Sequence, residues 1–140
     1  MIDELIDGIS LRLNKGFGAE KRIYSEKVEQ GLLKPGFFIK LVGVSQVPRL
    51  KGRCLRKHAF DISYYPLVNA SFGEMEAVAE ALFAVLETIT LANGDKIGGS
   101  SMSYQISDGI LHFLVNYDLH LQKVDTTEAM EGLEVKAGLE

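Results

Sequence analysis

Hydrophobic residues recur at spacings of three and four in two segments of the 140-residue chain, which predicts two amphipathic helices, over residues 2–14 and 72–86. The second is preceded by "SFGE", which has the form of a capping box: Ser71 bonds a backbone N–H and Glu74 reaches back. Gly16 is expected to end the first helix in the left-handed conformation. The apolar stripe of the second helix consists of Met75, Ala79, Leu82, Phe83 and Leu86.

Alternation of apolar and polar residues predicts strands in the rest of the chain. The segment "KRIYSEKV" (21–28) is a short candidate, and residues 60–65 form the apolar half of a longer one. The segment "GFFIKLVGV" (36–44) is apolar on both faces, so a central place in a sheet is expected. Asn93-Gly94 and Asp108-Gly109 are typical of tight hairpin turns, which makes the later strands antiparallel.

The last strand has two faces of different character. Its polar face carries His112, Asn116, Asp118 and His120, with Leu114 among them, and is expected to be solvated or shared with another subunit. Its apolar face is expected to be core and holds Leu111, Phe113, Val115, Tyr117, Leu119 and Leu121.

The order of these elements predicts the fold class. Helix, strands, helix and antiparallel strands make an α+β protein: a mostly antiparallel sheet with two helices packed on one face. Residues 1–124 are expected to be a single domain. Residues 125–140 lose the periodicity and are expected to form an acidic, mobile C-terminal tail.

Composition narrows the cellular setting. No apolar run approaches the roughly 18 residues needed to cross a bilayer. The N-terminus "MIDELIDGI" carries acids where a secretory signal carries basic residues, so no export is expected. The single cysteine, Cys54, excludes an internal disulfide and fits a reducing compartment.

Charge is distributed unevenly along the chain. Residues 1–57 hold 12 Lys and Arg against 6 Asp and Glu, whereas residues 58–140 hold 3 against 13. The formal net charge is −4. Proteins that bind duplex DNA usually have a basic total, so sequence-specific DNA binding is disfavoured.

Catalytic and metal-binding chemistry finds little support. His112 and His120 are eight residues apart on one strand, or about 26 Å, and cannot share an ion within one chain. Cys54 and His58 lie about 13 Å apart in a strand, which favours a structural thiol over a nucleophile. Neither "GGSSM" (98–102) nor "GFGAEK" (16–21) completes a nucleophile elbow or a dinucleotide-binding turn. We expect no enzymatic activity, no metal and no cofactor.

Two segments are candidates for protein contacts. The loop with Glu29, Gln30 and Gly31 has no visible second catalytic group, so a packing loop at a subunit interface is favoured over a working carboxylate. The stretch "RLKGRCLRK" is basic and contains no acid. It is either a solvated hairpin arm or a docking arm for an acidic partner surface. The candidate docking residues are Arg49, Lys51, Arg53, Arg56 and Lys57.

Four segments in order resemble a known family of small proteins. They are "IYSEKVEQGLLKPGFFIKL", "FDISYYP", "AEALFAVLETI" and "MSYQISDGILHFLVNYDLHLQK", and the likeness covers roughly residues 1–124. The family comprises tail terminator proteins of phages and phage-derived particles. The resemblance carries no catalytic signature.

The resemblance implies a structural role. Such proteins form a ring, commonly a hexamer, on the head-proximal end of the tail tube, where the ring stops tube polymerisation and meets the head connector. In contractile tails they also cap the sheath. The resemblance does not distinguish contractile from non-contractile tails, or phage from prophage and bacteriocin-like particles. The implied partners are other copies, the tube protein, the sheath and the connector, with genome DNA passing through the ring unread. The implied location is the virion tail, after assembly in the host cytoplasm. A small enzyme or ligand-binding module, or another head–tail joining protein, are the alternatives.

Overall fold

The chain forms two α-helices and seven β-strands within the residues that the computed structural model describes, which are 2–18, 21–25, 35–66, 72–123 and 133–136. A short 3-10 turn, η1, joins β2 to β3. The bounds are α1 (Ile2–Phe17), β1 (Arg22–Ser25), β2 (Gly36–Pro48), η1 (Leu50–Gly52), β3 (Arg53–Tyr65), α2 (Phe72–Val85), β4 (Thr88–Thr90), β5 (Lys96–Ser107), β6 (Ile110–Lys123) and β7 (Leu133–Lys136).

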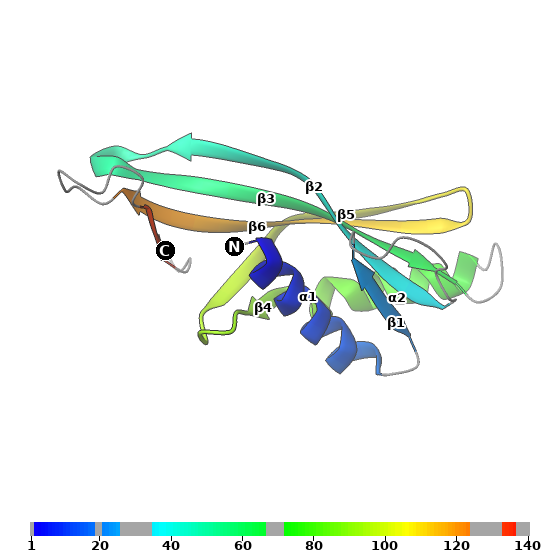
Figure 1. Cartoon of the computed structure of the whole chain (residues 1–140). Helices are drawn as coiled ribbons and strands as arrows, with labels where there is room; N and C mark the ends of the chain where they lie inside the picture. The colour runs from blue at the N-terminus through cyan, green and yellow to red at the C-terminus, as the bar shows by residue number, and fades with distance from the viewer. Residues whose placement is uncertain (1, 19–20, 26–34, 67–71, 124–132, 137–140) are drawn as a thin grey trace.

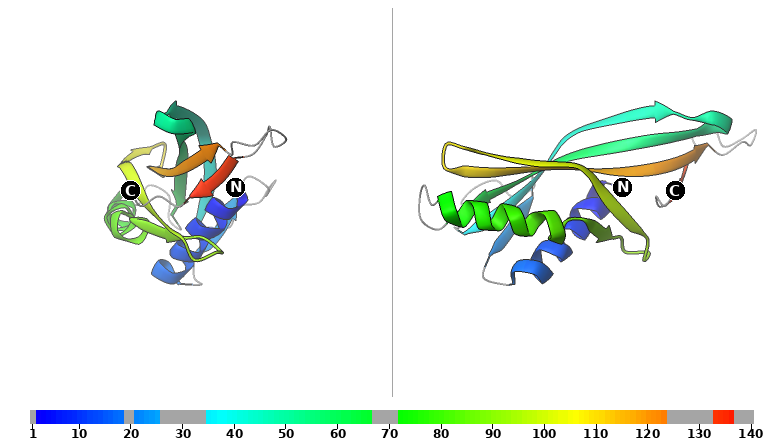
Figure 2. Two further views of the ribbon diagram at one scale, coloured as in Figure 1. Left: turned by 90° about the vertical axis from the view of Figure 1, so that its left-hand side faces the viewer. Right: turned by 180° about the vertical axis from the view of Figure 1, so that it is seen from behind.

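The strands make one sheet in the order β1-β2-β3-β6-β5-β4, with β7 paired to β6 (Figure 1). Only β1 and β2 run parallel; the other strand pairs in the described residues are antiparallel. Both helices pack against the same side of the sheet (Figures 1 and 2). The predicted α+β fold, with two helices on one face of a mostly antiparallel sheet, is confirmed.

The core lies between this sheet face and the helices. The apolar face of β6 is buried as predicted, and so is the predicted stripe of α2, apart from Phe83, which is partly buried. Tyr117 anchors the two layers: its hydroxyl donates a hydrogen bond to the carbonyl of Leu86 at 2.6 Å, and its burial raises its pKa. Arg12 of α1 donates to the carbonyl of Val85 at 2.9 Å. These two bonds satisfy carbonyl groups that the end of α2 leaves without helical partners.

The first helix ends later than its glycine suggests. The helix continues through Gly16 to Phe17, and Gly18 takes the left-handed conformation (φ 81°) while its N–H bonds the Asn14 carbonyl. The expectation that Gly16 ends the helix is therefore wrong. Gly16 has a packing role instead, because a Cβ atom there would lie 2.7 Å from a methyl group of Val85.

The start of the second helix agrees with its predicted position. Ser71, the predicted capping residue, lies outside the described residues. Glu74 accepts a hydrogen bond at 2.6 Å from the hydroxyl of Tyr64, whose pKa is raised by burial and by this carboxylate. The carboxylate therefore ties the first turn of α2 to β3.

The two predicted hairpins form with different turns. Ser107 pairs with Ile110 around Asp108 and Gly109, both with positive φ, as a two-residue turn requires. The other hairpin has a longer loop, because pairing stops at Thr90 and Lys96 and the N–H of Leu91 bonds the Asp95 carbonyl. The side chain of Asn93 bonds the N–H and the carboxylate of Asp95 within that loop.

Strand β2 departs from the prediction of a central position. It lies between β1 and β3 only over its first four residues, because β1 ends at Ser25 opposite Ile39. From Lys40 onward no strand in the described part of the chain pairs with its other edge. Val42 and Val44, which lie in this unpaired stretch, are 60% and 47% exposed.

The C-terminal segment contains a strand that the sequence pattern did not predict. Leu133–Lys136 forms β7 and pairs with the end of β6, from His120↔Lys136 to Lys123↔Leu133. The remainder of the predicted acidic tail lies outside the described residues, and its mobility stays a prediction.

Candidate functional site

A projecting arm is the most distinctive surface of the molecule. The C-terminal half of β2 and the N-terminal half of β3 extend beyond the helices, together with the C-terminal end of β6 (Figures 1 and 2). We call this projection the arm. At the tip, the N–H of Arg49 bonds the carbonyl of Arg53 at 2.7 Å, and η1 makes the turn. Lys51 and Gly52 both have positive φ, and Gln122 of β6 donates to the Lys51 carbonyl. The tip is thus a shaped turn braced by a neighbouring strand.

The five predicted docking cations all lie on this arm, but they do not form one patch. Arg49, Lys51 and Arg53 are exposed at the tip, next to Leu50, which is 84% exposed. Arg56 and Lys57 are half-buried and, being consecutive in a strand, point to opposite faces of the sheet.

Arg56 differs from the tip cations in having a fixed partner. Its Nε and one terminal nitrogen donate to the side-chain oxygen of Gln46 across the hairpin, at 2.9 and 2.6 Å. This pair braces the arm. Among the described residues, Arg49, Arg53 and Lys57 have no side-chain ion pair. The prediction of a basic hairpin arm therefore fits the structure, whereas docking stays a prediction.

The other predicted contact segment cannot be placed. Glu29, Gln30 and Gly31 lie outside the described residues, so their role at a subunit interface stays a prediction.

A cluster of polar side chains occupies the sheet face opposite the helices. Asp61, Ser63 and His112 meet there because β3 and β6 pair Ser63 with His112 and Asp61 with Leu114. The hydroxyl of Ser63 bonds Asp61 at 3.2 Å, and Nδ1 of His112 lies 3.1 Å from Asp61 and 3.2 Å from Ser63. A nucleophilic triad needs the serine and the acid on different ring nitrogens, whereas here both contact Nδ1. The cluster ties β3 to β6 and has no geometry for acyl transfer.

Further along this face lies a shallow depression of about 280 Å³ beside Lys57 and Asn116. Asp118 lies near it, since it pairs with Lys57 across the strands. One of its carboxylate oxygens is buried and has no hydrogen-bond partner among the described residues, and the other lies 3.5 Å from the Ser100 hydroxyl. Among the described residues, no three His, Cys, Asp or Glu side chains form a group that could hold a metal ion.

Cys54 and His58 lie on the same face of β3 as the core residues Phe60 and Ile62. Both are buried, and Nδ1 of His58 lies 3.3 Å from the Tyr117 carbonyl. Burial lowers the pKa of His58 below 6.5, and the nearby Arg56 acts in the same direction. A neutral, enclosed imidazole and an enclosed thiol are packing residues, in agreement with the structural role favoured for Cys54.

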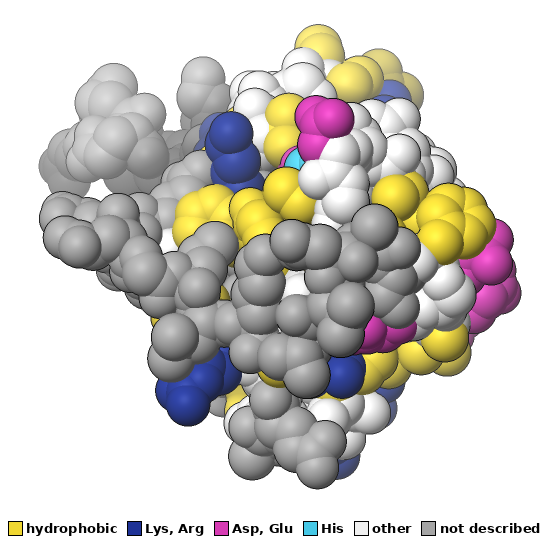
Figure 3. Space-filling model, turned by 90° about the vertical axis from the view of Figure 1, so that its right-hand side faces the viewer, with side chains coloured by type: hydrophobic (Ala, Val, Ile, Leu, Met, Phe, Trp, Pro, Cys, Tyr) yellow, Lys and Arg dark blue, Asp and Glu magenta, His cyan; other side chains and the backbone are white. Residues whose placement is uncertain are grey.

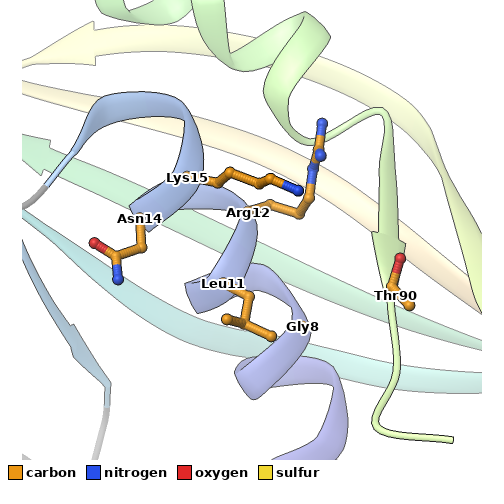
Figure 4. Close-up of a pocket in the computed structure, with 6 residues that line it drawn as sticks. All are labelled: Gly8, Leu11, Arg12, Asn14, Lys15 and Thr90. Carbon is orange, nitrogen blue, oxygen red and sulfur yellow. The ribbon is translucent and has the colours of Figure 1, made fainter. Parts of the chain in front are cut away.

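A pocket of about 440 Å³ lies between α1 and β4 (Figure 4). Gly8 allows the helix to approach the strand, since a Cβ atom there would lie 3.2 Å from the Thr90 carbonyl. Arg12 is engaged with the end of α2. The lining residues offer no carboxylate, imidazole or thiol and are Gly8, Leu11, Arg12, Asn14, Lys15 and Thr90. The described residues that line the pocket therefore supply no acid and base pair for catalysis.

Taken together, the arm and the polar sheet face offer contact surfaces, and the described residues bring together no set of reacting groups. Neither described helix is long and apolar enough to span a membrane. These features are typical of a protein that acts by binding other proteins.

Comparison with known families agrees with this class. A family model described as phage tail terminator protein matches residues 4–129, which is most of the chain. The chain belongs to the phage tail terminator family, as its sequence resemblance predicted. A comparison with individually curated proteins found no match. Membership gives the protein a structural role in tail assembly, contacts with other tail or virion proteins, and a place in the virion tail.

Proposed function

We propose that this chain caps the head-proximal end of the tail tube as a closed ring, commonly a hexamer in this family. The ring ends tube polymerisation and forms the surface that meets the head connector, and in a contractile tail it also meets the sheath. The observation that carries the proposal is the separation of surfaces within one sheet. The helices cover one face, while the opposite polar face and the projecting arm remain for contacts. A cap needs such distinct surfaces for the tube, its neighbours and the connector.

Within this proposal, the arm docks on an acidic protein surface. Arg49, Lys51 and Arg53 are exposed at its tip, and Leu50 supplies an apolar contact between them. The arms do not line the DNA channel, because cations there would hold the phosphates that must pass. Acidic residues of the second half of the chain line it instead. The loop of Glu29, Gln30 and Gly31 contributes to the contact between neighbouring subunits.

A tube assembly assay tests the proposal. Tube protein is polymerised with and without the purified chain, and tube lengths are measured by electron microscopy. We expect shorter tubes of narrower length distribution as the chain is added, because capped ends stop growing. Unchanged tube lengths together with binding to the connector would indicate a different head–tail joining protein and would contradict the proposed capping.

A further inference from the structure

The outward side of α2 carries an unusual arrangement of exposed residues. Phe72, Glu76 and Glu80 are spaced by four and all exposed, so they share one stripe along a flank of the helix, beside its buried residues. Phe72 is 56% exposed. Like charges four residues apart slightly destabilise a helix. No Lys or Arg occurs anywhere between residues 58 and 95 to offset them along the chain. We call these three residues the helix stripe.

The arm tip has the opposite charge to the helix stripe, and it also combines two like charges with an exposed hydrophobic side chain. Arg49 and Arg53 stand across from each other where the hairpin closes, and both are exposed. Like charges directly opposite in a hairpin are also unfavourable. Leu50 beside them is the most exposed large hydrophobic residue in the described part of the chain. Each surface therefore places two like charges beside an exposed hydrophobic side chain, at a local cost in stability.

The two surfaces match in spacing. Residues opposite each other in a hairpin have Cβ atoms about 5 Å apart. Residues one turn apart on a helix have Cβ atoms about 5–6 Å apart. Arg49 and Arg53 can therefore meet Glu76 and Glu80 as two charge-assisted pairs, with Leu50 against Phe72.

One molecule cannot make this contact with itself. The arm tip and the first turn of α2 lie at opposite ends of the molecule in both side views (Figures 1 and 2). The end that carries the first turn of α2 faces the viewer in Figure 3, where exposed hydrophobic side chains lie beside Asp and Glu side chains. The complementary surface must therefore belong to a second molecule.

We propose that the arm tip of one copy docks on the helix stripe of the next copy. The contact is head-to-tail, so each copy uses both surfaces, and repetition closes a ring when the rotation between copies permits it. This inference deepens the proposed ring assembly, on which it rests, by identifying the acidic surface that the arm recognises as α2 of a neighbouring copy.

Charge reversal on both sides tests the contact. The arm variant is Arg49→Glu with Arg53→Glu, and the helix variant is Glu76→Arg with Glu80→Arg. Self-association of the full chain is measured by analytical ultracentrifugation at low salt and high protein concentration. Each variant alone should associate at least roughly tenfold more weakly, because two attractive pairs become repulsive. The mixture of the two variants should associate like the wild type, since each arm then meets a stripe of opposite charge. Lys15→Glu with Lys96→Glu, two exposed cations elsewhere, is the control for the arm variant's change in net charge.

Cross-linking identifies the contact independently of particle assembly. A carbodiimide couples Lys51 to Glu76 or Glu80, and a mixture of ¹⁴N- and ¹⁵N-labelled chains distinguishes links between molecules. Mixed-isotope links between these residues, reduced at high salt, are expected. Wild-type chain without such links, or a helix variant that associates like the wild type, would overturn the proposal. If the arm variant impairs tail assembly and the helix variant does not, the arm binds another tail protein, and this result would also overturn the proposal. Tubes that are not capped while the links persist would contradict the proposed function and leave this contact standing.

Discussion

Strands β2 and β3 pass through two regions of very different character. Under the helices, Phe37, Ile39 and Phe60 are fully buried. In the arm, the same strands carry exposed Val42 and end at a tip of exposed cations. The difference shows that one pair of strands serves two purposes: the helix-covered part supplies folding stability, and the arm supplies surface for contacts. Changes in the first region should affect unfolding, and changes in the second should affect assembly.

The largest expected effect on stability comes from the helix-covered region. Leu82 of α2 is fully buried in the core, as its predicted stripe required. Leu82→Ala should lower the free energy of unfolding by about 2–5 kcal/mol, because it removes buried methyl groups and leaves a cavity. Val44→Ala in the arm is the matched control and should cost well under that amount. Chemical denaturation of both variants measures the difference, and equal losses would contradict the division into two regions.

Two helical glycines sharpen the same comparison within the helix layer. Gly16→Ala places a Cβ atom 2.7 Å from Val85 and should destabilise the protein by about 1–3 kcal/mol. Gly73→Ala meets no atom within 4 Å and should stabilise it by about 0.4–1 kcal/mol, since alanine restricts the unfolded chain. Thermal denaturation should therefore shift in opposite directions. A stabilised Gly16→Ala variant would show that the contact between α1 and Val85 is loose.

A pH effect should arise at the junction of the two regions. His58 is buried with a pKa lowered below 6.5, so the unfolded chain binds the proton more readily than the folded chain. This contribution to stability is fully present above pH 6.5 and is lost as the pH falls from 6.5 to the lowered folded-state pKa. His58→Gln should flatten the fall in unfolding free energy over that window, as followed by denaturation at several pH values. His120→Gln, on the other face of the sheet, should retain the fall; a fall of undiminished size in His58→Gln would assign it to other groups.

The smallest effect on stability is expected at the arm. Replacing Arg53, Arg56 and Lys57 together with Ser should change the free energy of unfolding by about 1 kcal/mol or less for each charge, with most of the loss at Arg56, whose bonds to Gln46 brace the arm. Tail assembly should nevertheless fall, and is measured by counting complete particles. A triple Ser variant at Lys15, Lys40 and Lys96 is the control, since all three are exposed and lie outside the arm tip. Normal assembly by the variant with Ser at positions 53, 56 and 57 would indicate that the arm is a solvated hairpin without a docking role.

Much of the fold follows from local patterns in the sequence. The apolar stripes identified both helices, and alternation identified the buried face of β6 residue by residue. The position of each strand within the sheet was harder to predict from the sequence. The apolar run of β2 resembles a central strand, but β1 is too short to cover it, and pairing partners depend on the whole topology. Gly16 misled for a similar reason, because its role is set by Val85, some 70 residues away in the chain.

The candidate site was predictable in composition and not in geometry. The absence of acids between Arg49 and Lys57 is enough to indicate a basic arm. The cluster of Asp61, Ser63 and His112 was missed, because only the register between β3 and β6 brings these residues together. The alternation of Asp61 with Phe60 and Ile62, and the polar face containing His112, placed each residue on a strand face without pairing them. The bond between Arg56 and Gln46 likewise depends on how the hairpin closes.

Electron microscopy of tail tubes mixed with the purified chain tests the central claim most directly. The account predicts a single closed ring on one end of each tube, with arms reaching from each subunit to the next and the polar sheet face in contact with neighbouring proteins. The triple arm variant should fold normally and decorate fewer tube ends. Bare tube ends at saturating concentrations of the wild-type chain would contradict the account. Rings formed equally well by the triple arm variant would also contradict it.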